Sequence, residues 1–102
     1  MKINGRTLEV MLFFAARSRK EFSGYDLSKA LGIASGTLYP LLVKMEGAGL
    51  LYSRWEDGDP QKMGRPRRRY YRINGQGIRA VTTRMRDIDP RYALVAGNPE
   101  FS

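Results

Sequence analysis

The sequence contains no cysteine and no histidine in its 102 residues. Without cysteine, the chain cannot form disulfides or thiolate metal sites. Without histidine, it lacks the usual general base, the commonest metal ligand and the side chain that titrates nearest to neutral pH. We therefore expect no catalytic residue, no cofactor and no metal site. A small basic chain of this kind is typical of a binding module rather than an enzyme.

Acidic residues and long apolar runs are also scarce. The chain has 10 aspartates and glutamates against 18 lysines and arginines, so its formal net charge is +8. This excess favours an anionic partner, most often nucleic acid, with an acidic membrane surface as the alternative. The longest apolar run, VMLFFAA, is far too short to span a membrane.

The length and the hydrophobic fraction of 42% predict one small folded domain. We expect it to cover residues 1–89 and to leave residues 90–102, which show no clear period, as a loose tail. Because a chain of this size buries only a small core, association with a second copy would add stability.

The first periodic segment is expected to form a helix from Thr7, its N-cap, to Arg17. Four apolar residues recur on one face at helical spacing, namely Leu8, Met11, Leu12 and Ala15. The other faces are apolar too, which favours burial against a second subunit as well as against the chain's own core. The alternative is a single, deeply buried central helix.

A second, short helix is expected to begin after Ser23. Ser23 stands three residues before Asp26, which is the spacing of a capping box, and Gly32 stands where a helix often ends in a left-handed residue. The inner face is expected to carry Leu27, Ala30 and Leu31.

A third helix is expected to start at the cap Ser35 and to end at the glycines at positions 47 and 49. Its inner face would consist of Leu38, Leu41, Leu42 and Met45. Pro40 lacks an amide and crowds the carbonyl four residues back, so it must lie near the helix start, which it would bend or tighten. A cap nearer Thr37 would relieve that strain. Two helices joined by a short glycine-containing turn match a helix-turn-helix.

Two aromatic-rich stretches downstream alternate with the period of a strand. The alternating residues are Leu51, Ser53 and Trp55 in the first stretch and Arg69, Tyr71 and Ile73 in the second. We expect Tyr71 and Ile73 to face the core. The segment between the two stretches is rich in glycine, proline and aspartate and predicts a long hairpin loop that is mobile without a partner.

The return side of this loop is strongly basic. Six of the 18 lysines and arginines lie between Lys62 and Arg72. The simplest interpretation is charge pairing within a solvated turn. However, the three nearby acids Glu56, Asp57 and Asp59 are too few for the four arginines Arg65, Arg67, Arg68 and Arg69. Because Arg68 and Arg69 point to opposite faces of a strand, we expect only one of them to reach a partner.

A fourth helix is expected after the hairpin, with Asn74 as its N-cap and Pro90 at its end. Four apolar residues recur along it at nearly heptad spacing, namely Ile78, Val81, Met85 and Ile88. Such a narrow seam suits packing against another helix.

The order of these elements predicts an α+β, mostly helical winged helix-turn-helix fold, with three N-terminal helices, a two-stranded wing and a C-terminal helix. The stretches GTLYPLLVKMEGAGLLYSRWE and GRPRRRYYRINGQG also resemble the PadR-like transcriptional regulators. The resemblance spans about Ser23 to Gly77. It implies a sequence-specific, homodimeric repressor that binds a near-palindromic operator in double-stranded DNA. Its expected location is the bacterial cytoplasm, with the nucleoid when bound.

By this resemblance, the third helix would enter the major groove and the wing would reach the backbone or the adjacent minor groove. A helix N-terminus offers amides and hydroxyls to phosphate, and arginines suit a narrow groove of concentrated negative potential. The residues expected to bind DNA are Tyr25, Ser35, Gly36, Thr37, Tyr39, Pro40, Lys44, Lys62, Gly64, Arg65, Pro66, Arg67 and Arg68. Two alternatives stay open: Tyr39 packs in the core against the wing, or Tyr25 is half-buried.

The resemblance also implies that the first and last helices form the dimer interface, through Leu8, Met11, Leu12, Ala15, Ile78, Val81, Met85 and Ile88. The chain departs from the family where RSRKEF replaces a short GP turn and where Pro90 stops the last helix early. A small-molecule inducer is unsupported, because the single tryptophan, Trp55, lies in the wing and looks structural. No membrane partner is expected. A winged-helix module for protein interaction or architecture is the alternative function.

Overall fold

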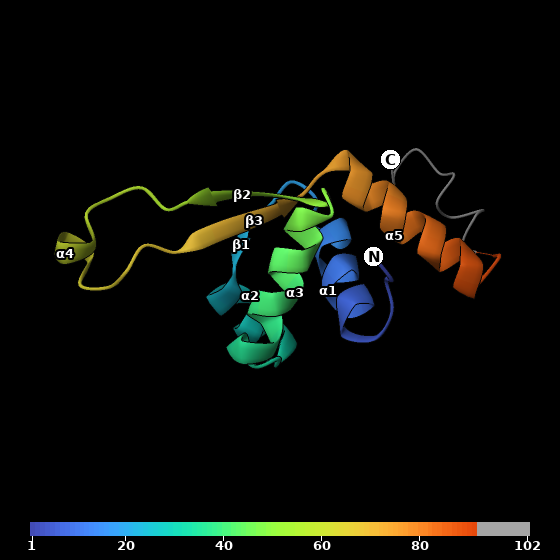
Figure 1. The fold of residues 1–102 in the computed structure, drawn as a ribbon, viewed down its shortest axis with the longest axis horizontal. Helices are drawn as coiled ribbons and strands as arrows, with labels where there is room; N and C mark the ends of the chain where they lie inside the picture. Colours follow the sequence, from blue (N-terminus) through green and yellow to red (C-terminus); the bar gives the residue numbers. More distant parts are fainter. Residues whose placement is uncertain (92–102) are drawn as a thin grey trace.

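The computed structural model describes residues 1–91. The elements are α1 (Gly5–Ala16), β1 (Phe22–Ser23), α2 (Gly24–Leu31), α3 (Ser35–Gly47), β2 (Leu51–Trp55), α4 (Pro60–Met63), β3 (Arg69–Ile73) and α5 (Gly75–Ile88). Figure 1 shows α1, α2 and α3 below the sheet, with the β2–β3 hairpin reaching to one side and α5 to the other. The predicted α+β, mostly helical winged helix-turn-helix fold is confirmed. Within the described part of the chain, no helix has the length and apolar character that a membrane span requires.

The hydrophobic core lies where α1, α2 and α3 meet the sheet and α5. Its largest fully buried apolar side chains are Phe14, Met11, Leu27, Leu38, Leu42, Met45, Val10 and Val81. Phe22 of β1 closes one side of this core, with its ring centroid 4.9 Å from that of Phe13 and 6.0 Å from that of Phe14. Several of these side chains come from α1, so the core supports the interpretation of α1 as the central helix.

The start of α1 differs from the prediction. The helix begins at Gly5 with Asn4 as its N-cap, and Thr7 lies inside the first turn with 8% of its surface exposed. The Asn4 carbonyl accepts a hydrogen bond from the Leu8 amide at 3.3 Å, while the Asn4 side chain makes no capping bond. The helix therefore starts with a backbone hydrogen bond and no side-chain cap. The prediction of Thr7 as the N-cap, which relied on the preference of threonine for that position, is wrong.

α2 begins and ends where the sequence predicts. Ser23 Oγ accepts a hydrogen bond from the Asp26 amide at 3.1 Å, and the Asp26 carboxylate accepts one from the Ser23 amide at 2.9 Å. Gly32 ends the helix in the left-handed region, with φ of +67°. The predicted inner face is correct at Leu27, which is fully buried, but wrong at Ala30, which is exposed. A helix of two turns presents only a narrow stripe to the core.

α3 begins at Ser35, but its N-cap is Ala34 rather than Ser35. The helix continues through Pro40, whose missing amide removes the usual bond to the Gly36 carbonyl. The predicted inner face is confirmed, with Leu41 half-buried and the other three side chains fully buried: Leu38, Leu42 and Met45.

The sheet has three antiparallel strands in the order β1-β3-β2, so the predicted two-stranded wing, β2 and β3, is joined by a third strand that was not predicted. In the hairpin, Leu51 pairs with Ile73 and Trp55 pairs with Arg69. Tyr71 and Ile73 are both buried, as predicted. The missed strand, β1, has two residues and pairs with β3 on the side opposite β2. Two residues show no period, so the sequence pattern could not indicate this strand.

The loop between β2 and β3 contains a helical turn that was not predicted. The Asp59 carboxylate caps α4 by accepting a hydrogen bond from the Gln61 amide at 3.0 Å, and Pro60 is the first helical residue. Gly64 ends the turn with φ of +71°. Aspartate, proline and glycine act here as helix start and stop signals rather than as turn formers alone.

α5 starts at the predicted cap. Asn74 Oδ1 accepts a hydrogen bond from the Gly77 amide, and Asn74 Nδ2 donates one to the Gly49 carbonyl, both at 2.8 Å. Gly77 is required by close packing, because a Cβ atom there would lie 2.3 Å from the Leu50 carbonyl oxygen. The helix ends at Ile88, before Pro90. The predicted loose tail falls almost wholly outside the described residues.

Candidate nucleic-acid interface

The wing and the helix-turn-helix meet at Tyr25 in the first turn of α2. The guanidinium carbon of Arg68 lies 4.4 Å from the centroid of the Tyr25 ring, and Lys29 Nζ lies 4.9 Å from it. A hydrogen bond with Lys29, followed by the charge of that lysine, lowers the pKa of the Tyr25 phenol. Tyr25 is 48% exposed, so about half of its surface is accessible to a partner, and the half-buried alternative agrees with this exposure as well. Two cations therefore flank one exposed phenol.

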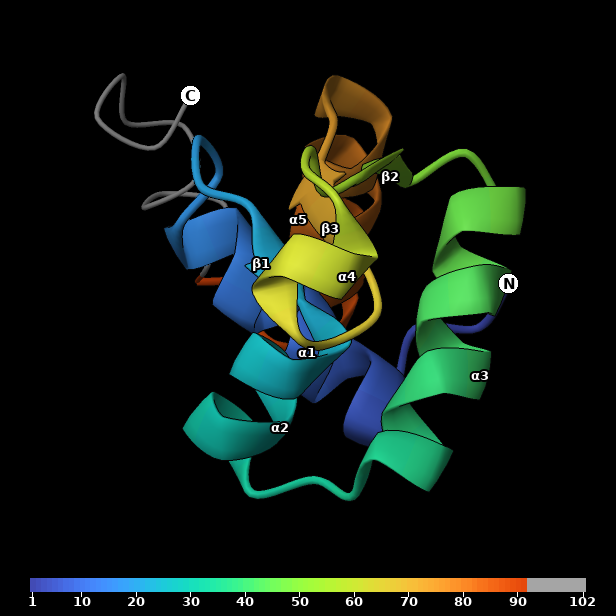
Figure 2. The ribbon, with the colours of Figure 1, turned by 90° about the vertical axis from the view of Figure 1, so that its left-hand side faces the viewer.

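The exposed face of α3 carries most of the predicted DNA-binding residues of the helix-turn-helix. The exposed residues of the predicted DNA-binding set on this helix are Ser35, Gly36, Thr37, Tyr39, Pro40 and Lys44. The first turn combines small side chains and hydroxyls with the amides of a helix N-terminus, which are suited to phosphate. Lys44 adds a cation further along the same helix. Figure 2 shows α2 below the wing tip and α3 to its right.

Tyr39 is the largest side chain on this face. Tyr39 is 47% exposed, so it is not a core residue. The alternative interpretation, in which Tyr39 packs in the core against the wing, is therefore wrong. One edge of its ring lies against Gly24, where an added Cβ atom would be 2.8 Å from Tyr39 Cζ. Gly24 thus allows the tyrosine to lie between α2 and α3 while much of its ring stays accessible.

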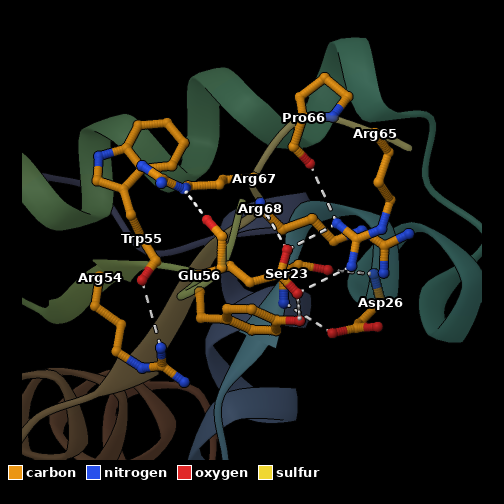
Figure 3. Close-up of polar contacts among 11 residues, drawn as sticks. Ser23, Asp26, Arg54, Trp55, Glu56, Arg65, Pro66, Arg67 and Arg68 are labelled. Atoms are coloured by element: carbon orange, nitrogen blue, oxygen red, sulfur yellow. Dashed lines mark hydrogen bonds and ion pairs between the residues drawn. The ribbon is translucent and has the colours of Figure 1, made fainter. Parts of the chain in front are cut away.

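Glu56 is the centre of the polar contacts in the wing (Figure 3). Its carboxylate forms a two-pronged ion pair with Arg65, with Nη1–Oε1 and Nη2–Oε2 distances of 2.7 and 2.9 Å. The same carboxylate accepts hydrogen bonds from the Arg68 amide at 3.2 Å and from the Tyr70 hydroxyl at 3.4 Å. The Arg65 hydrogen bond is the main reason why the pKa of Glu56 is lowered from 4.5 to about 2.

Arg69 connects the wing to the end of α3. Its Nη2 donates hydrogen bonds to Ser53 Oγ at 2.6 Å and to the Glu46 carboxylate at 3.3 Å, and Ser53 also donates to Glu46. The Arg69 guanidinium lies 5.1 Å from the Trp55 ring centroid. Trp55 is 58% exposed, and its ring lies beside this arginine within the wing. Its interpretation as a structural residue stays a prediction.

The other basic side chains of the run lie at the surface. Arg67 is exposed and donates from Nε to the Gly58 carbonyl at 2.7 Å, which leaves its two terminal nitrogens available to a partner. Lys62 on α4 is exposed, as are Gly64 and Pro66. Arg68 and Arg69 do point to opposite faces, the first to Tyr25 and the second to Glu46.

The three acids nearest to the basic run pair with fewer arginines than the run contains, as the sequence predicts. The nearby acids do not neutralise the arginines: among them only Glu56 pairs with one, while Asp59 caps α4. A more distant acid, Glu46 of α3, pairs with Arg69. Sequence reasoning missed Glu46 and Ser53 because their contacts join separate elements. It also missed Lys29, although this lysine stands one helical turn after Tyr25 in α2. Glu56 carried a usable signal, since it directly follows the first strand of the hairpin, opposite the basic run.

An open cleft of about 600 Å³ lies between α3 and the wing. Its lining residues are Tyr39, Trp55, Arg65, Pro66, Arg67, Arg68, Arg69 and Tyr71. Aromatic rings and guanidinium groups thus share one concave surface next to the exposed face of α3. Such a surface is suited to the sugar-phosphate backbone of a nucleic acid. Within residues 1–91, no group of three or more acidic side chains could hold a metal ion.

The residues predicted to form a dimer interface are not equally available. Met11 and Val81 are buried in the core of the protomer itself, with exposures of 0% and 1%, so they have no surface for a second subunit. Those predictions are wrong because the helical face that carries them packs α1 against α5. The others retain exposed surface, with Ile88 at 51%: Leu8, Leu12, Ala15, Ile78, Met85 and Ile88.

Comparisons with known proteins agree with this architecture. The model of the PadR-like family of transcriptional regulators matches residues 15–83, more than half of the chain. A PadR family regulator from Eggerthella lenta DSM 2243 is 31% identical, with a TM-score of 0.62, over 89% of this chain and 77% of that one. A PadR-like regulator from Bacillus cereus is 22% identical, with a TM-score of 0.58, over 92% and 100% of the two chains.

A more distant likeness extends the fold comparison. A mutant form of MepR from S. aureus is 20% identical, with a TM-score of 0.67, over 96% of this chain and 68% of that one. No curated protein sequence matches the chain significantly. The family match, together with a basic helix-turn-helix and wing, identifies the chain as a member of the PadR-like family of DNA-binding transcriptional regulators, which are not enzymes.

Proposed function

We propose that the chain is a homodimeric repressor that recognises a near-palindromic operator in double-stranded DNA. In this proposal α3 enters the major groove, and the wing follows the backbone or enters the adjacent minor groove. The observation that carries it is the contact of Arg68 with the exposed ring of Tyr25, 4.4 Å from its centroid. This contact joins the wing to the helix-turn-helix, so that one duplex can meet both.

The proposed DNA contacts follow from exposure and chemistry. Ser35, Gly36 and Thr37 would bind phosphate at the start of α3, and Tyr39, Pro40 and Lys44 would face base edges or groove walls. Phosphate would also lie against Tyr25 and Arg68. At the wing tip, Lys62 and Arg67 would supply charge, while Gly64 and Pro66 shape the backbone.

A homodimer would form through α1 and α5. The surface left on these helices is apolar and half-exposed, at Leu8, Leu12, Ala15, Ile78, Met85 and Ile88. Two-fold pairing of the protomers would set two α3 helices on two half-sites, which accounts for a near-palindromic operator. Residues 1–89 would then carry both DNA binding and dimerisation, in the bacterial cytoplasm.

Repression is the simplest outcome of such binding, because blocking a promoter requires no surface beyond the one that holds the DNA. The test is a fluorescence-anisotropy titration at moderate salt, with duplex from the chain's own upstream region and a scrambled duplex. We expect clear preference for the upstream duplex and a sedimentation mass of a dimer. Equal binding of both duplexes would favour a protein-interaction or architectural role, and a monomer at micromolar concentration would contradict the α1–α5 interface.

A further inference from the structure

Arg65 stands in the most basic part of the wing, yet its guanidinium is already engaged. Both of its terminal nitrogens bond to the carboxylate of Glu56, at 2.7 and 2.9 Å, and Nη1 also donates to the Pro66 carbonyl at 3.2 Å. The Glu56 side chain is only 17% exposed and that of Arg65 is 36% exposed. A planar, two-pronged arginine–carboxylate pair is among the strongest polar contacts in proteins.

The pair lies at the neck of the wing. Glu56 is the first residue after β2. Its amide donates a hydrogen bond to the Arg68 carbonyl at 2.7 Å, and its carboxylate accepts one from the Arg68 amide. Both sides of the hairpin are therefore held at Glu56. Arg65 follows α4 in the chain, and its ion pair with Glu56 brings the two sides of the loop together. The loop segment between these two residues, which contains α4, is thus closed at its base (Figures 1 and 3).

Beyond the neck, the loop is organised by its own backbone. The amides of Gly64 and Arg65 both donate to the Pro60 carbonyl, at 3.0 and 3.3 Å. Arg67 crosses the loop to the Gly58 carbonyl at 2.7 Å. The ion pair thus holds Arg65 at the neck, at the base of the loop that carries Arg67 and Lys62.

We infer that Glu56 and Arg65 form a clasp that positions the wing tip, and that Arg65 acts on DNA only through Glu56 and not by contact with phosphate. The inference rests on the proposed function for its effect on DNA, although the clasp itself exists in the free protein. Glu56 is then an acid that promotes the binding of a polyanion, because it holds neighbouring cations in place.

Glu56→Gln separates this role from a simple electrostatic one. If Arg65 contacted phosphate directly, removing the acid beside it would release the arginine and reduce repulsion, so DNA would bind more tightly. The clasp predicts the opposite sign, with affinity for the upstream duplex weaker by roughly three- to tenfold. Asp57→Asn is the matched control, because Asp57 is the next residue and forms no ion pair within residues 1–91. This control should bind as tightly as the unmodified protein or more tightly.

Arg65→Lys provides a second and independent variant. Lysine keeps the positive charge but cannot form the two-pronged pair, so a direct phosphate contact would survive and the clasp would not. We expect Arg65→Lys to weaken binding about as much as Glu56→Gln, and the double variant to be no weaker than either. Losses that add in the double variant would overturn the inference.

Amide hydrogen exchange of the DNA-free protein tests the clasp apart from DNA binding. Exchange over residues 58–67 should rise in Glu56→Gln and stay unchanged in Asp57→Asn, with thermal melting by circular dichroism confirming that each variant is folded. If wild type shows no duplex preference, the proposed repressor fails while this result still decides the clasp. Unchanged loop exchange in Glu56→Gln, or tighter DNA binding by it, would overturn the inference, and Arg65→Lys carries the same test if Glu56→Gln does not fold.

Discussion

Arg69 of β3 lies 3.3 Å from Glu46 in the last turn of α3, across an interval of 23 residues. Ser53 of β2 completes the contact by donating to Glu46 and accepting from Arg69 at 2.6 Å. The helix proposed to read the major groove is thus tied to both strands of the wing. In the proposed complex, this link would set the angle at which the two elements meet a duplex.

Glu46→Gln should reduce the preference for the upstream duplex over a scrambled one. If the wing and α3 are misaligned, the contacts of α3 with specific bases are weakened, so specific binding falls. Non-specific binding depends mainly on the total charge and should change little. The pair is about one-third exposed, so the free energy of unfolding should change by no more than about 1 kcal/mol. Anisotropy titrations with both duplexes measure the ratio. Glu9→Gln in α1 removes an equal charge as the control, and an equal change in the ratio for both variants would contradict the role of Glu46.

Arg67→Ala should weaken DNA binding and lower the slope of log K against log salt by about one unit, as expected for the loss of one phosphate contact. Arg67 is exposed and engages only its Nε within the wing. Titrations at several salt concentrations give the slope. Arg6→Ala, which removes an arginine paired with Glu9 on α1, should leave it unchanged. An unaltered slope for Arg67→Ala would remove this arginine from the interface.

The wing should resist acid more than an ordinary glutamate pair would allow. The hydrogen bond from Arg65 lowers the pKa of Glu56 from 4.5 to about 2. The ion pair therefore contributes fully to the stability of the fold above about pH 4.5, and this contribution is lost as the pH falls towards 2. Carboxyl carbon shifts from NMR should show Glu56 still ionised at pH 3.5. In Arg65→Lys the midpoint should move upward. A midpoint near 4.5 in the unmodified protein would show that the ion pair is absent in solution.

Gly77→Ala should destabilise the fold although alanine favours helices. Its Cβ atom would lie 2.3 Å from the Leu50 carbonyl oxygen and 2.7 Å from Ile73 Cγ1, at the junction of α5 with the sheet. Overpacking of this kind costs about 1–3 kcal/mol, which urea unfolding can resolve. Gly47→Ala is the control, since no heavy atom lies within 4 Å of its added Cβ. A stability loss no larger than in Gly47→Ala would contradict the close packing.

Much of the fold follows from local signals in the sequence. The capping box of Ser23 and Asp26, the cap at Asn74 and the alternation that buries Tyr71 and Ile73 were all predictable, because each depends on residues a few positions apart. α4 carried usable signals too, but Pro60 and its neighbours also fit an ordinary turn.

The remaining features depend on contacts between distant parts of the chain. β1 exists because the segment after α1 runs along β3, which no two-residue pattern reveals. Met11 follows the same spacing as half-exposed Leu12, and only the packing of other elements around α1 decides that Met11 is buried. The division of the basic run follows in the same way, because Glu46 pairs with Arg69 from another element. Sequence pattern predicts which residues are apolar or charged, and tertiary contacts decide which of them stay accessible.

The central claim is that α3 and the wing form one DNA-binding surface joined at Tyr25 and Arg68. Amide hydrogen exchange with and without the upstream duplex tests it most directly, with the scrambled duplex as the control. We predict slower exchange on binding in both the first half of α3, residues 35–44, and the wing tip, residues 58–68. Protection confined to one of these two segments would contradict the account.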